Sequence, residues 1–117
     1  MTQVFVYGTL KKGFGNNVLL QNSNFIGEGF VEADMFNFGS FPVVSEGKGS
    51  VKGEVYEVND SVFQSLDRLE GYPNFYDRKK VHVRSEAGDL SAWMYFMSKE
   101  KITKLPRVFE GVWKWVK

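Results

Sequence analysis

Glu70 is the residue whose type and position point most clearly to chemistry. A helix turns by about 100° per residue, and at that spacing Glu70 falls inside the apolar arc formed by Val62, Phe63, Leu66 and Leu69. A carboxylate that faces a core is costly unless it is paired or neutralised, and the last turn of a helix also disfavours negative charge. Both effects are expected to raise the pKa of Glu70 towards neutrality, as a general acid or base requires.

Two structural explanations of Glu70 stay open at the level of sequence. Fraying of the helix end would let the side chain swing out into solvent, or Arg78 would pair with it and neutralise its charge. Asp67 lies just outside the edge of the apolar arc, and Arg68 points towards solvent. Glu70 is therefore the acidic residue of this helical turn that is aimed at the core.

The turn formed by Tyr7, Gly8, Thr9 and Leu10 is the second candidate, directly after a β-branched and aromatic run. A strand that ends in glycine can turn so that successive backbone N–H groups point into one concavity and bind a carboxylate or phosphate. The Thr9 hydroxyl would add a donor. The segment is not a Walker loop, because no Gly-Lys-Ser/Thr follows Gly8 at the needed spacing. An ordinary turn would explain the same residues.

Composition excludes several other chemistries. The chain has no cysteine, which rules out disulfides, Cys-ligated zinc and thiol catalysis. Its single histidine, His82, lies on the polar face of an alternating segment, so neither a Ser-His-Asp triad nor a His-rich metal site is expected. The 15 Lys and Arg nearly balance the 14 Asp and Glu. A net charge of +1 argues against nucleic acid or an anionic membrane as the main partner.

The elements that must position these residues are strands and one helix. Apolar runs and alternation predict strands at 4–7, across 25–41, at 41–44, 50–58, 80–84 and 90–97, the last buried on both faces. A loop is expected at 11–17 and a single helical turn at 18–20. Asn59 begins the main helix, which runs to Glu70 and stops at Gly71. About six strands without strand–helix alternation predict an α+β fold, a small mixed, strongly bent sheet or barrel with one main helix packed on it.

Length and composition fit one domain spanning residues 1–117. Hydrophobic residues make up 43% of the chain, with 11 Phe, 5 Tyr and 3 Trp, which is enough to bury a core. The N-terminal residues lack a basic region followed by a long apolar run, and the longest apolar stretch, 92–97, is far too short to span a bilayer. A cytoplasmic protein without a membrane partner is expected.

Four segments together resemble the gamma-glutamylcyclotransferase-like superfamily, especially its small members related to gamma-glutamylamine cyclotransferase. They are VFVYGTLKKG at 4–13, GEVY at 53–56, LDRLEG at 66–71 and YDR at 76–78. The Tyr-Gly-Thr-Leu opening combined with a later Asp-x-x-Glu-Gly is the specific pair. The order and spacing of these segments cover most of the chain, from about residue 3 to residue 97.

The resemblance implies a small mixed barrel with a cavity at one end, and no metal or cofactor. Members cyclise the glutamyl group of a gamma-glutamyl amide and release 5-oxoproline and a free amine, a transferase- or lyase-type reaction. By the same resemblance Glu70 is the catalytic acid/base. Substrate binding is implied for Tyr7, Gly8, Thr9, Leu10, Tyr76 and Arg78. The substrate supplies its own nucleophile, the α-amine, so the lack of cysteine is no handicap.

Two other classes of function are weighed against the enzyme. One is a non-catalytic protein that binds a small amino-acid metabolite in the same cavity. The other is an interaction protein in which Trp113 and Trp115 form a dimer surface, and both a monomer and a homodimer fit the sequence. These tryptophans share one face of an extended chain, so both should be at least half buried. An intact Glu70 beside an intact loop favours the enzyme.

Overall fold

The computed structural model describes residues 1–86 and 88–114. In chain order its elements are β1 (Thr2–Val6), η1 (Gly15–Leu20), β2 (Asn24–Asn37), β3 (Pro42–Val58), α1 (Asp60–Glu70), β4 (Asp77–Ser85), β5 (Gly88–Phe96), η2 (Lys99–Lys101) and β6 (Arg107–Val108). The two η elements are 3-10 helices. No helix among the described residues is long and apolar enough to cross a bilayer.

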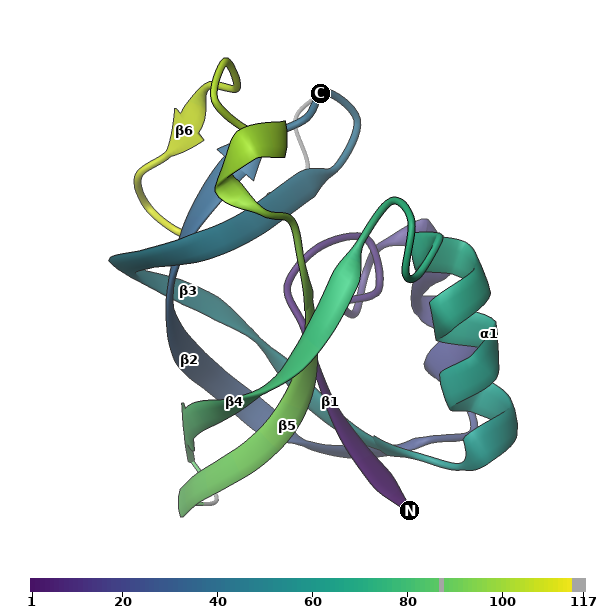
Figure 1. Ribbon diagram of the computed structural model, residues 1–117. Coiled ribbons are helices and arrows are strands. Elements are labelled where there is room, and N and C mark those ends of the chain that lie inside the picture. The colour runs from purple at the N-terminus through teal and green to yellow at the C-terminus, as the bar shows by residue number, and fades with distance from the viewer. Residues whose placement is uncertain (87, 115–117) are drawn as a thin grey trace.

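Five strands close into a mixed barrel, with α1 lying against one side (Figure 1). The strand order is β3–β1–β5–β4–β2, and β2 pairs back with β3 to complete the circle, while β6 adds to β2. The β1–β5 pair is parallel and the other pairs are antiparallel. The predicted α+β barrel with one main helix is therefore confirmed. The β2–β4 pairing is short and joins Gly29 to Ser85 and Phe30 to Arg84.

Alternation along β1 supplies two separate clusters of buried side chains. Phe5 joins a cluster with members from every barrel strand, such as Val55, which places this cluster inside the barrel. Val6 faces the opposite way and packs with Leu66 of α1 and Leu20 of η1. The first strand thus carries the barrel interior on one face and the helix contact on the other. Full burial of such side chains contributes about 1.5–3 kcal/mol each.

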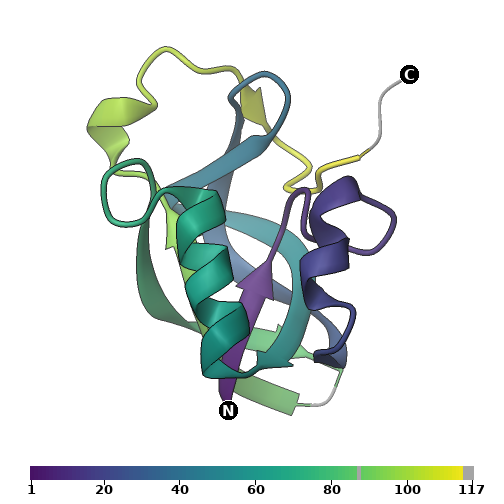
Figure 2. The same ribbon diagram turned by 90° about the vertical axis from the view of Figure 1, so that its right-hand side faces the viewer.

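The ends of α1 form where the local sequence predicts them. The Asn59 side chain accepts a hydrogen bond from the Val62 N–H at 2.8 Å and caps the first turn. Gly71 takes the left-handed conformation at φ 65°, and its N–H donates to the Arg68 carbonyl. Glu70 is consequently the last helical residue. Figure 2 shows α1 and η1 on the same flank, with β1 leading towards the loop that precedes η1.

Three local predictions differ from the structure. The segments 41–44 and 50–58 are one strand, β3, because Gly47 and Gly49 do not turn the chain but make room for the Asp34 carboxylate of β2. Asp34 accepts a hydrogen bond from the Gly49 N–H at 2.9 Å, beside a register shift in the β2–β3 ladder. The predicted loop at 11–17 already contains the start of η1 at Gly15. β5 is buried on both faces only in its second half, since Ser91 is exposed.

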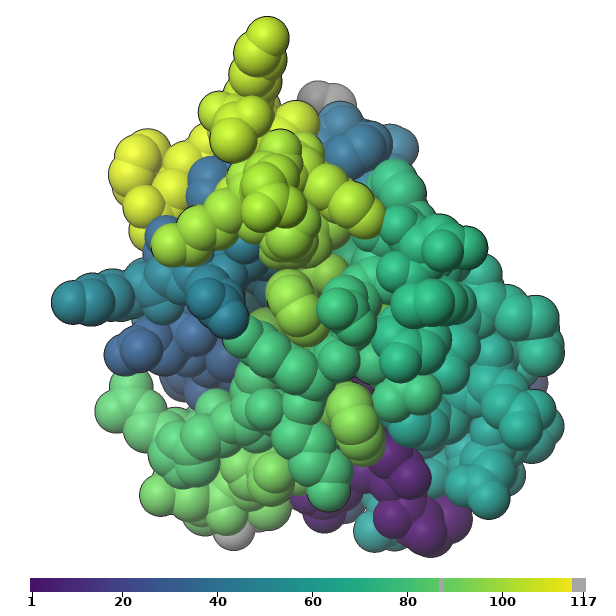
Figure 3. Space-filling view, in the orientation of Figure 1, coloured from purple at the N-terminus to yellow at the C-terminus, as the bar shows by residue number. Residues whose placement is uncertain are grey.

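The segment after β5 covers one end of the molecule, where its yellow-green side chains pack beside the β2–β3 strands (Figure 3). Further along the chain, Trp113 is partly buried against the barrel interior, as predicted. Trp115, the other tryptophan of that prediction, lies outside the described residues.

Candidate active site

A cavity of about 500 Å³ opens where β1 ends, α1 ends and β3 begins. Six of the seven residues predicted to form the catalytic and substrate-binding site line it: Tyr7, Gly8, Thr9, Leu10, Glu70 and Tyr76. Arg78 does not belong to the lining. Tyr95 of β5 does, although nothing in the sequence motifs marks it. The end of the first strand and the end of the main helix therefore meet at one concave site, which is where binding sites usually form.

Glu70 carries the only carboxylate in the lining of this cavity, among the residues that the structure describes. Its side chain is partly buried and has neither a hydrogen-bond nor an ion-pair partner in residues 1–86 and 88–114. Only its backbone carbonyl is engaged, by the Tyr76 N–H at 3.3 Å. Burial raises the pKa of Glu70 to about 7. An unpaired carboxyl of this kind can both accept and return a proton at neutral pH.

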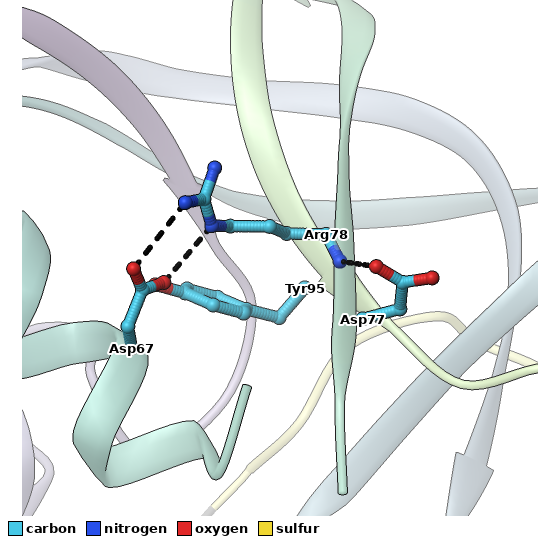
Figure 4. Close-up of polar contacts among 4 residues, drawn as sticks. All are labelled: Asp67, Asp77, Arg78 and Tyr95. Atoms are coloured by element: carbon cyan, nitrogen blue, oxygen red, sulfur yellow. Dashed lines mark hydrogen bonds and ion pairs between the residues drawn. The ribbon is translucent and has the colours of Figure 1, made fainter. Parts of the chain in front are cut away.

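Arg78 pairs with Asp67 and not with Glu70, so the second structural explanation of Glu70 is wrong. The guanidinium Nε donates to Asp67 Oδ1 at 2.9 Å and Nη2 donates to Oδ2 at 3.3 Å, a two-pronged contact drawn in Figure 4. The Tyr95 hydroxyl donates to the same carboxylate at 2.7 Å. Asp67 thus uses both oxygens to hold β4 and β5 against α1.

The Arg78 guanidinium is also enclosed by aromatic rings. Its centre lies 4.4 Å from the ring centroid of Phe63, 4.3 Å from that of Tyr72 and 4.7 Å from that of Trp93. Such stacking stabilises a cation that has left water. This position explains why Arg78 matches the family pattern without bordering the cavity, and it leaves direct contact with a substrate a prediction that the geometry does not favour.

Three tyrosines line the cavity together with Glu70: Tyr7, Tyr76 and Tyr95. Tyr7 donates to the Tyr95 carbonyl at 2.9 Å and Tyr76 donates to the Pro42 carbonyl at 2.9 Å, both in buried positions. Burial is the main cause that raises the pKa of Tyr7, Tyr76 and Tyr95, and the charge of Glu70 raises all three further. The Glu70 carboxylate is therefore within electrostatic reach of every one of them. All three stay protonated at neutral pH and act as donors.

The loop after β1, whose residues line the cavity, has three backbone N–H groups without an acceptor among the described residues. The N–H groups of Gly8, Thr9 and Leu10 donate to no other group of the described residues. Carbonyls hold the loop in place instead: Gly8 accepts from the Lys11 N–H at 3.0 Å and Thr9 accepts from the Asn16 N–H at 3.2 Å. Consecutive unpaired N–H groups are a binding site for an anion such as a carboxylate.

Asn16 and Asn17 hold this loop in place through side-chain hydrogen bonds, a role that sequence motifs do not reveal. Asn16 Nδ2 donates to the Thr9 hydroxyl at 2.9 Å, which leaves the hydroxyl proton free to donate elsewhere. Asn17 Nδ2 donates to the Leu10 carbonyl at 2.8 Å. The only sequence signal for them is a pair of asparagines in a glycine-rich turn, where their side chains often bond to nearby backbone.

Gly8 lies at a closely packed point of the chain. That a branched side chain here would block the approach of a carboxylate stays a prediction. The structure shows that a Cβ at Gly8 would first meet the Pro42 ring, at 2.8 Å from Cγ and 2.9 Å from Cδ. Close packing of the β1 end on the start of β3 therefore demands glycine.

The described residues contain no group of three or more His, Cys, Asp or Glu side chains that could hold a metal ion. His82 is exposed, and its Nε2 lies 3.4 Å from Asp89. The residues that line the cavity thus include one carboxyl with a raised pKa, three residues whose backbone N–H groups have no acceptor among the described residues, and three tyrosines whose hydroxyls donate to protein acceptors.

Comparison with known proteins places the chain in a family. Residues 4–115 match the family described as gamma-glutamyl cyclotransferase, AIG2-like. A protein of Methanocaldococcus jannaschii named "Putative gamma-glutamylcyclotransferase" is 43% identical over 101 residues, which cover 82% of this chain and 84% of that protein. A protein of the same name from Vibrio cholerae is 39% identical over 94 residues, 79% of this chain and 78% of the other.

Solved structures agree with the sequence relatives. An AIG2-like protein from Mus musculus superposes with a TM-score of 0.81 at 25% identity, covering all of this chain and 97% of the mouse chain. A Pyrococcus horikoshii protein gives a TM-score of 0.74 at 28% identity, over 96% of this chain and 89% of that one. The chain therefore belongs to the gamma-glutamyl cyclotransferase, AIG2-like family.

Proposed function

We propose that the protein converts a gamma-glutamyl amide into 5-oxoproline and a free amine, with Glu70 as the general acid/base. The observation that carries this proposal is the unpaired Glu70 carboxyl, with its pKa raised to about 7, in the same cavity as three free backbone N–H groups. Family membership supports the type of reaction.

Substrate binding follows from the donors of the loop. The N–H groups of Gly8, Thr9 and Leu10 hold the α-carboxylate of the glutamyl group, and the Thr9 hydroxyl adds a fourth donor. Fixing that end of the substrate brings its α-nitrogen near Glu70 and lets the chain fold back on its own γ-carbonyl carbon. An intramolecular attack of this kind gains rate from proximity alone.

Proton transfer is the part that the enzyme must supply. Ionised Glu70 takes a proton from the α-ammonium, and the free amine attacks the γ-carbonyl carbon to close a five-membered ring. The bond to the leaving nitrogen then breaks while Glu70 returns the proton to it. In total the α-nitrogen loses two protons and the leaving nitrogen gains two, so Glu70 carries them one at a time without net change. A pKa of about 7 suits both directions of transfer.

The test is Glu70→Gln, assayed by release of 5-oxoproline from a panel of gamma-glutamyl amides. Glutamine keeps the shape of the side chain but exchanges no proton, so turnover should fall by a factor on the order of 100 to 10,000. Substrate affinity should change little. Glu100→Gln, an exposed carboxylate in η2, is the matched control and should keep full activity.

Two outcomes would contradict the proposal. A folded Glu70→Gln variant with near wild-type turnover removes Glu70 from the chemistry. A wild-type protein that binds these amides and releases no 5-oxoproline is instead the non-catalytic binding protein, which uses the same cavity without reaction.

A further inference from the structure

A second concave site lies at the seam of the barrel where β2 and β4 separate. Among the described residues these strands pair only at Gly29 with Ser85 and at Phe30 with Arg84, and from there they diverge (Figure 1). A cleft of about 970 Å³ is lined by both strands, together with residues of β3, β5 and η2. We call it the seam cleft. It shares no lining residue with the Glu70 cavity.

The lining of the seam cleft is positively charged, although the chain as a whole carries a net charge of only +1. Five cationic side chains border it against two carboxylates, within the part of the chain that the structure describes: Lys48, Lys79, Lys80, Arg84 and Lys99 against Glu32 and Glu46. A concavity lined mainly by one sign of charge concentrates ligands of the opposite sign. The cleft therefore favours an anionic ligand.

Most of these cations have no anionic partner in the protein. The side chains of Lys48, Arg84 and Lys99 form no hydrogen bond or ion pair with any described residue. Lys79 is engaged, since its Nζ lies 3.1 Å from Glu46 Oε1. The hydrogen bond from Lys79, its charge and the charge of Lys99 lower the pKa of Glu46, so Lys99 lies near this pair. Unpaired cations beside a cleft are available to the anionic groups of a ligand.

Ser45 adds a hydroxyl at the floor of the seam cleft. The residue is only 2% exposed, yet it borders the cleft, and its hydroxyl has no hydrogen-bond partner among the described residues. Every side-chain nitrogen or oxygen of those residues that is sealed from solvent does have a partner, so the Ser45 hydroxyl must open into the cleft. A polar group at this depth, unpaired within the protein, is a donor for a ligand.

The seam cleft has an aromatic end and a cationic end. Phe30 is 44% exposed and lies opposite Arg84 in the β2–β4 pair. Lys79 lies five residues before Arg84 on β4, about 17 Å away at the rise of a strand. The floor includes buried apolar side chains of the barrel interior, namely Val31, Ala33 and Met94. A ligand that fills the cleft is therefore extended, with a flat ring at one end and anionic groups at the other.

We propose that the seam cleft is a second ligand site and that it binds a nucleoside diphosphate or triphosphate. The base stacks on Phe30, as any base does on an exposed aromatic ring. The phosphates pair with Lys79 and Lys99, and the Ser45 hydroxyl donates to a phosphate oxygen. The inference does not rest on the proposed function, because Glu70 and its loop lie outside this cleft.

Calorimetric titration of the wild-type protein with ADP, AMP and adenosine, at low salt and without Mg²⁺, tests the site. Affinity should fall severalfold from ADP to AMP and again to adenosine, because each phosphate lost leaves cations unpaired. Added salt should weaken ADP binding. Pyrophosphate and citrate carry several anionic groups without a base, so both should bind more weakly than ADP.

Variants locate the binding in the seam cleft. Lys79→Ala and, separately, Lys99→Ala should weaken ADP binding by about three- to tenfold. Phe30→Ala should weaken ADP binding and leave pyrophosphate binding unchanged. Glu46→Gln should instead strengthen ADP binding, because it releases Lys79. Lys104→Ala is the matched control: it removes the same charge from an exposed residue outside the cleft and should leave the affinity unchanged.

Several results would overturn the inference. They are an absence of ADP binding by the folded wild type, equal affinities for ADP, AMP and adenosine, and binding of citrate or pyrophosphate as tightly as ADP. A loss in Lys104→Ala as large as in Lys79→Ala would show that net charge and not the cleft is responsible. A single-stranded oligonucleotide that competes with ADP and binds more tightly would make the cleft a nucleic-acid surface instead.

The seam cleft and the Glu70 site can be tested separately. Glu70→Gln should bind ADP with wild-type affinity, and Lys79→Ala should release 5-oxoproline at the wild-type rate when no nucleotide is present. Failure of ADP binding thus leaves the proposed reaction standing, and failure of the reaction leaves the nucleotide site standing. Loss of ADP binding in a folded Glu70→Gln variant would place the nucleotide in the wrong cavity and overturn the inference.

Discussion

Glu70 occupies a position that stabilises its protonated form, and this has a consequence for folding as well as for reactivity. The carboxyl is buried without a partner, so ionisation costs free energy in the folded protein that it does not cost in the unfolded chain. The ionised side chain therefore lowers the stability of the fold, as is common at sites that do chemistry.

The pH dependence of stability should reveal that cost. Because the pKa of Glu70 rises from 4.5 to about 7 on folding, the folded protein binds the proton more tightly. Its contribution to stability is complete below about pH 4.5, falls as the pH rises to about 7, and is constant above. The slope is at most about 1.4 kcal/mol per pH unit. The free energy of unfolding, measured with urea at pH 5 and pH 8, should be higher for Glu70→Gln relative to wild type at pH 8 than at pH 5. If the difference in unfolding free energy between wild type and variant is the same at both pH values, the pKa of Glu70 is not raised by folding.

At the scale of elements, Asp67 joins three of them. Through Arg78 and Tyr95 it ties the last turns of α1 to β4 and β5, and the backbone of Tyr95 in turn accepts the Tyr7 hydroxyl at the end of β1. The wall of the cavity thus depends on a carboxylate that does not line it. Asp67 and Arg78 are positioning residues in this arrangement.

Asp67→Asn should therefore lower both stability and activity. Loss of the charge leaves the Arg78 guanidinium poorly paired in a partly buried place, at a cost of about 1–3 kcal/mol. We expect a lower kcat with an unchanged pH profile, because Glu70 is intact. Glu46→Gln is the control: it breaks the exposed Lys79–Glu46 pair and should change stability little. A shifted pH profile in Asp67→Asn would instead give Asp67 a part in proton transfer.

The junction of β1 with β3 supplies a second prediction at this scale. Gly8→Ala should cost about 1–3 kcal/mol, because the new Cβ overlaps the Pro42 ring. Gly8→Val should in addition weaken binding of a gamma-glutamyl amide. In a double-mutant cycle, Pro42→Ala should recover much of the stability that Gly8→Ala loses. Additive effects would show that the glycine is not needed for this contact, and wild-type binding by Gly8→Val would remove the loop from substrate anchoring.

Elements set by local signals could be read from the sequence, and long-range contacts could not. The helix ends were predictable because Asn59 and Gly71 act on their own neighbours. The continuity of β3 could not be predicted, because Gly47 and Gly49 make room for the Asp34 side chain of another strand, β2. In the site, the position of Glu70 in the apolar arc of α1 identifies it as a candidate. Which carboxylate pairs with Arg78 depends instead on how β4 lies against the helix. The sequence gives no motif that marks Tyr95 as a site residue. It indicates only that a tyrosine in a buried strand needs a hydrogen-bond partner for its hydroxyl.

At the scale of the whole molecule, the chain after β6 packs back onto β3 and onto the segment after β1. The Lys52 N–H donates to the Gly111 carbonyl at 2.9 Å, and Lys11 reaches the Trp113 carbonyl. Gly111 has φ +67°, and a Cβ there would collide with the Ser50 carbonyl. The segment 108–113 is therefore tied to β3 and to the loop that borders the cavity.

Gly111→Ala should loosen this segment. The left-handed conformation alone disfavours alanine by about 1–2 kcal/mol, and the contact with β3 adds to that. We expect a lower midpoint of thermal unfolding and easier quenching of tryptophan fluorescence by acrylamide, because Trp113 loses its packing. Gly15→Ala is the matched control, since a Cβ there meets open space. An unchanged melting midpoint in Gly111→Ala would mean that the closing segment contributes little.

Barrel closure also sets the order in which the protein can mature on the ribosome. The end of β1 reaches its final place only when β5 lies beside it in parallel, and the Tyr7–Tyr95 hydrogen bond joins residues 88 positions apart. Contacts so distant in sequence form slowly and late. A nascent chain therefore carries the loop at 7–10 from the start, yet the cavity that this loop lines is incomplete until Tyr95 of β5 has joined it. The cavity is thus completed last, together with the barrel.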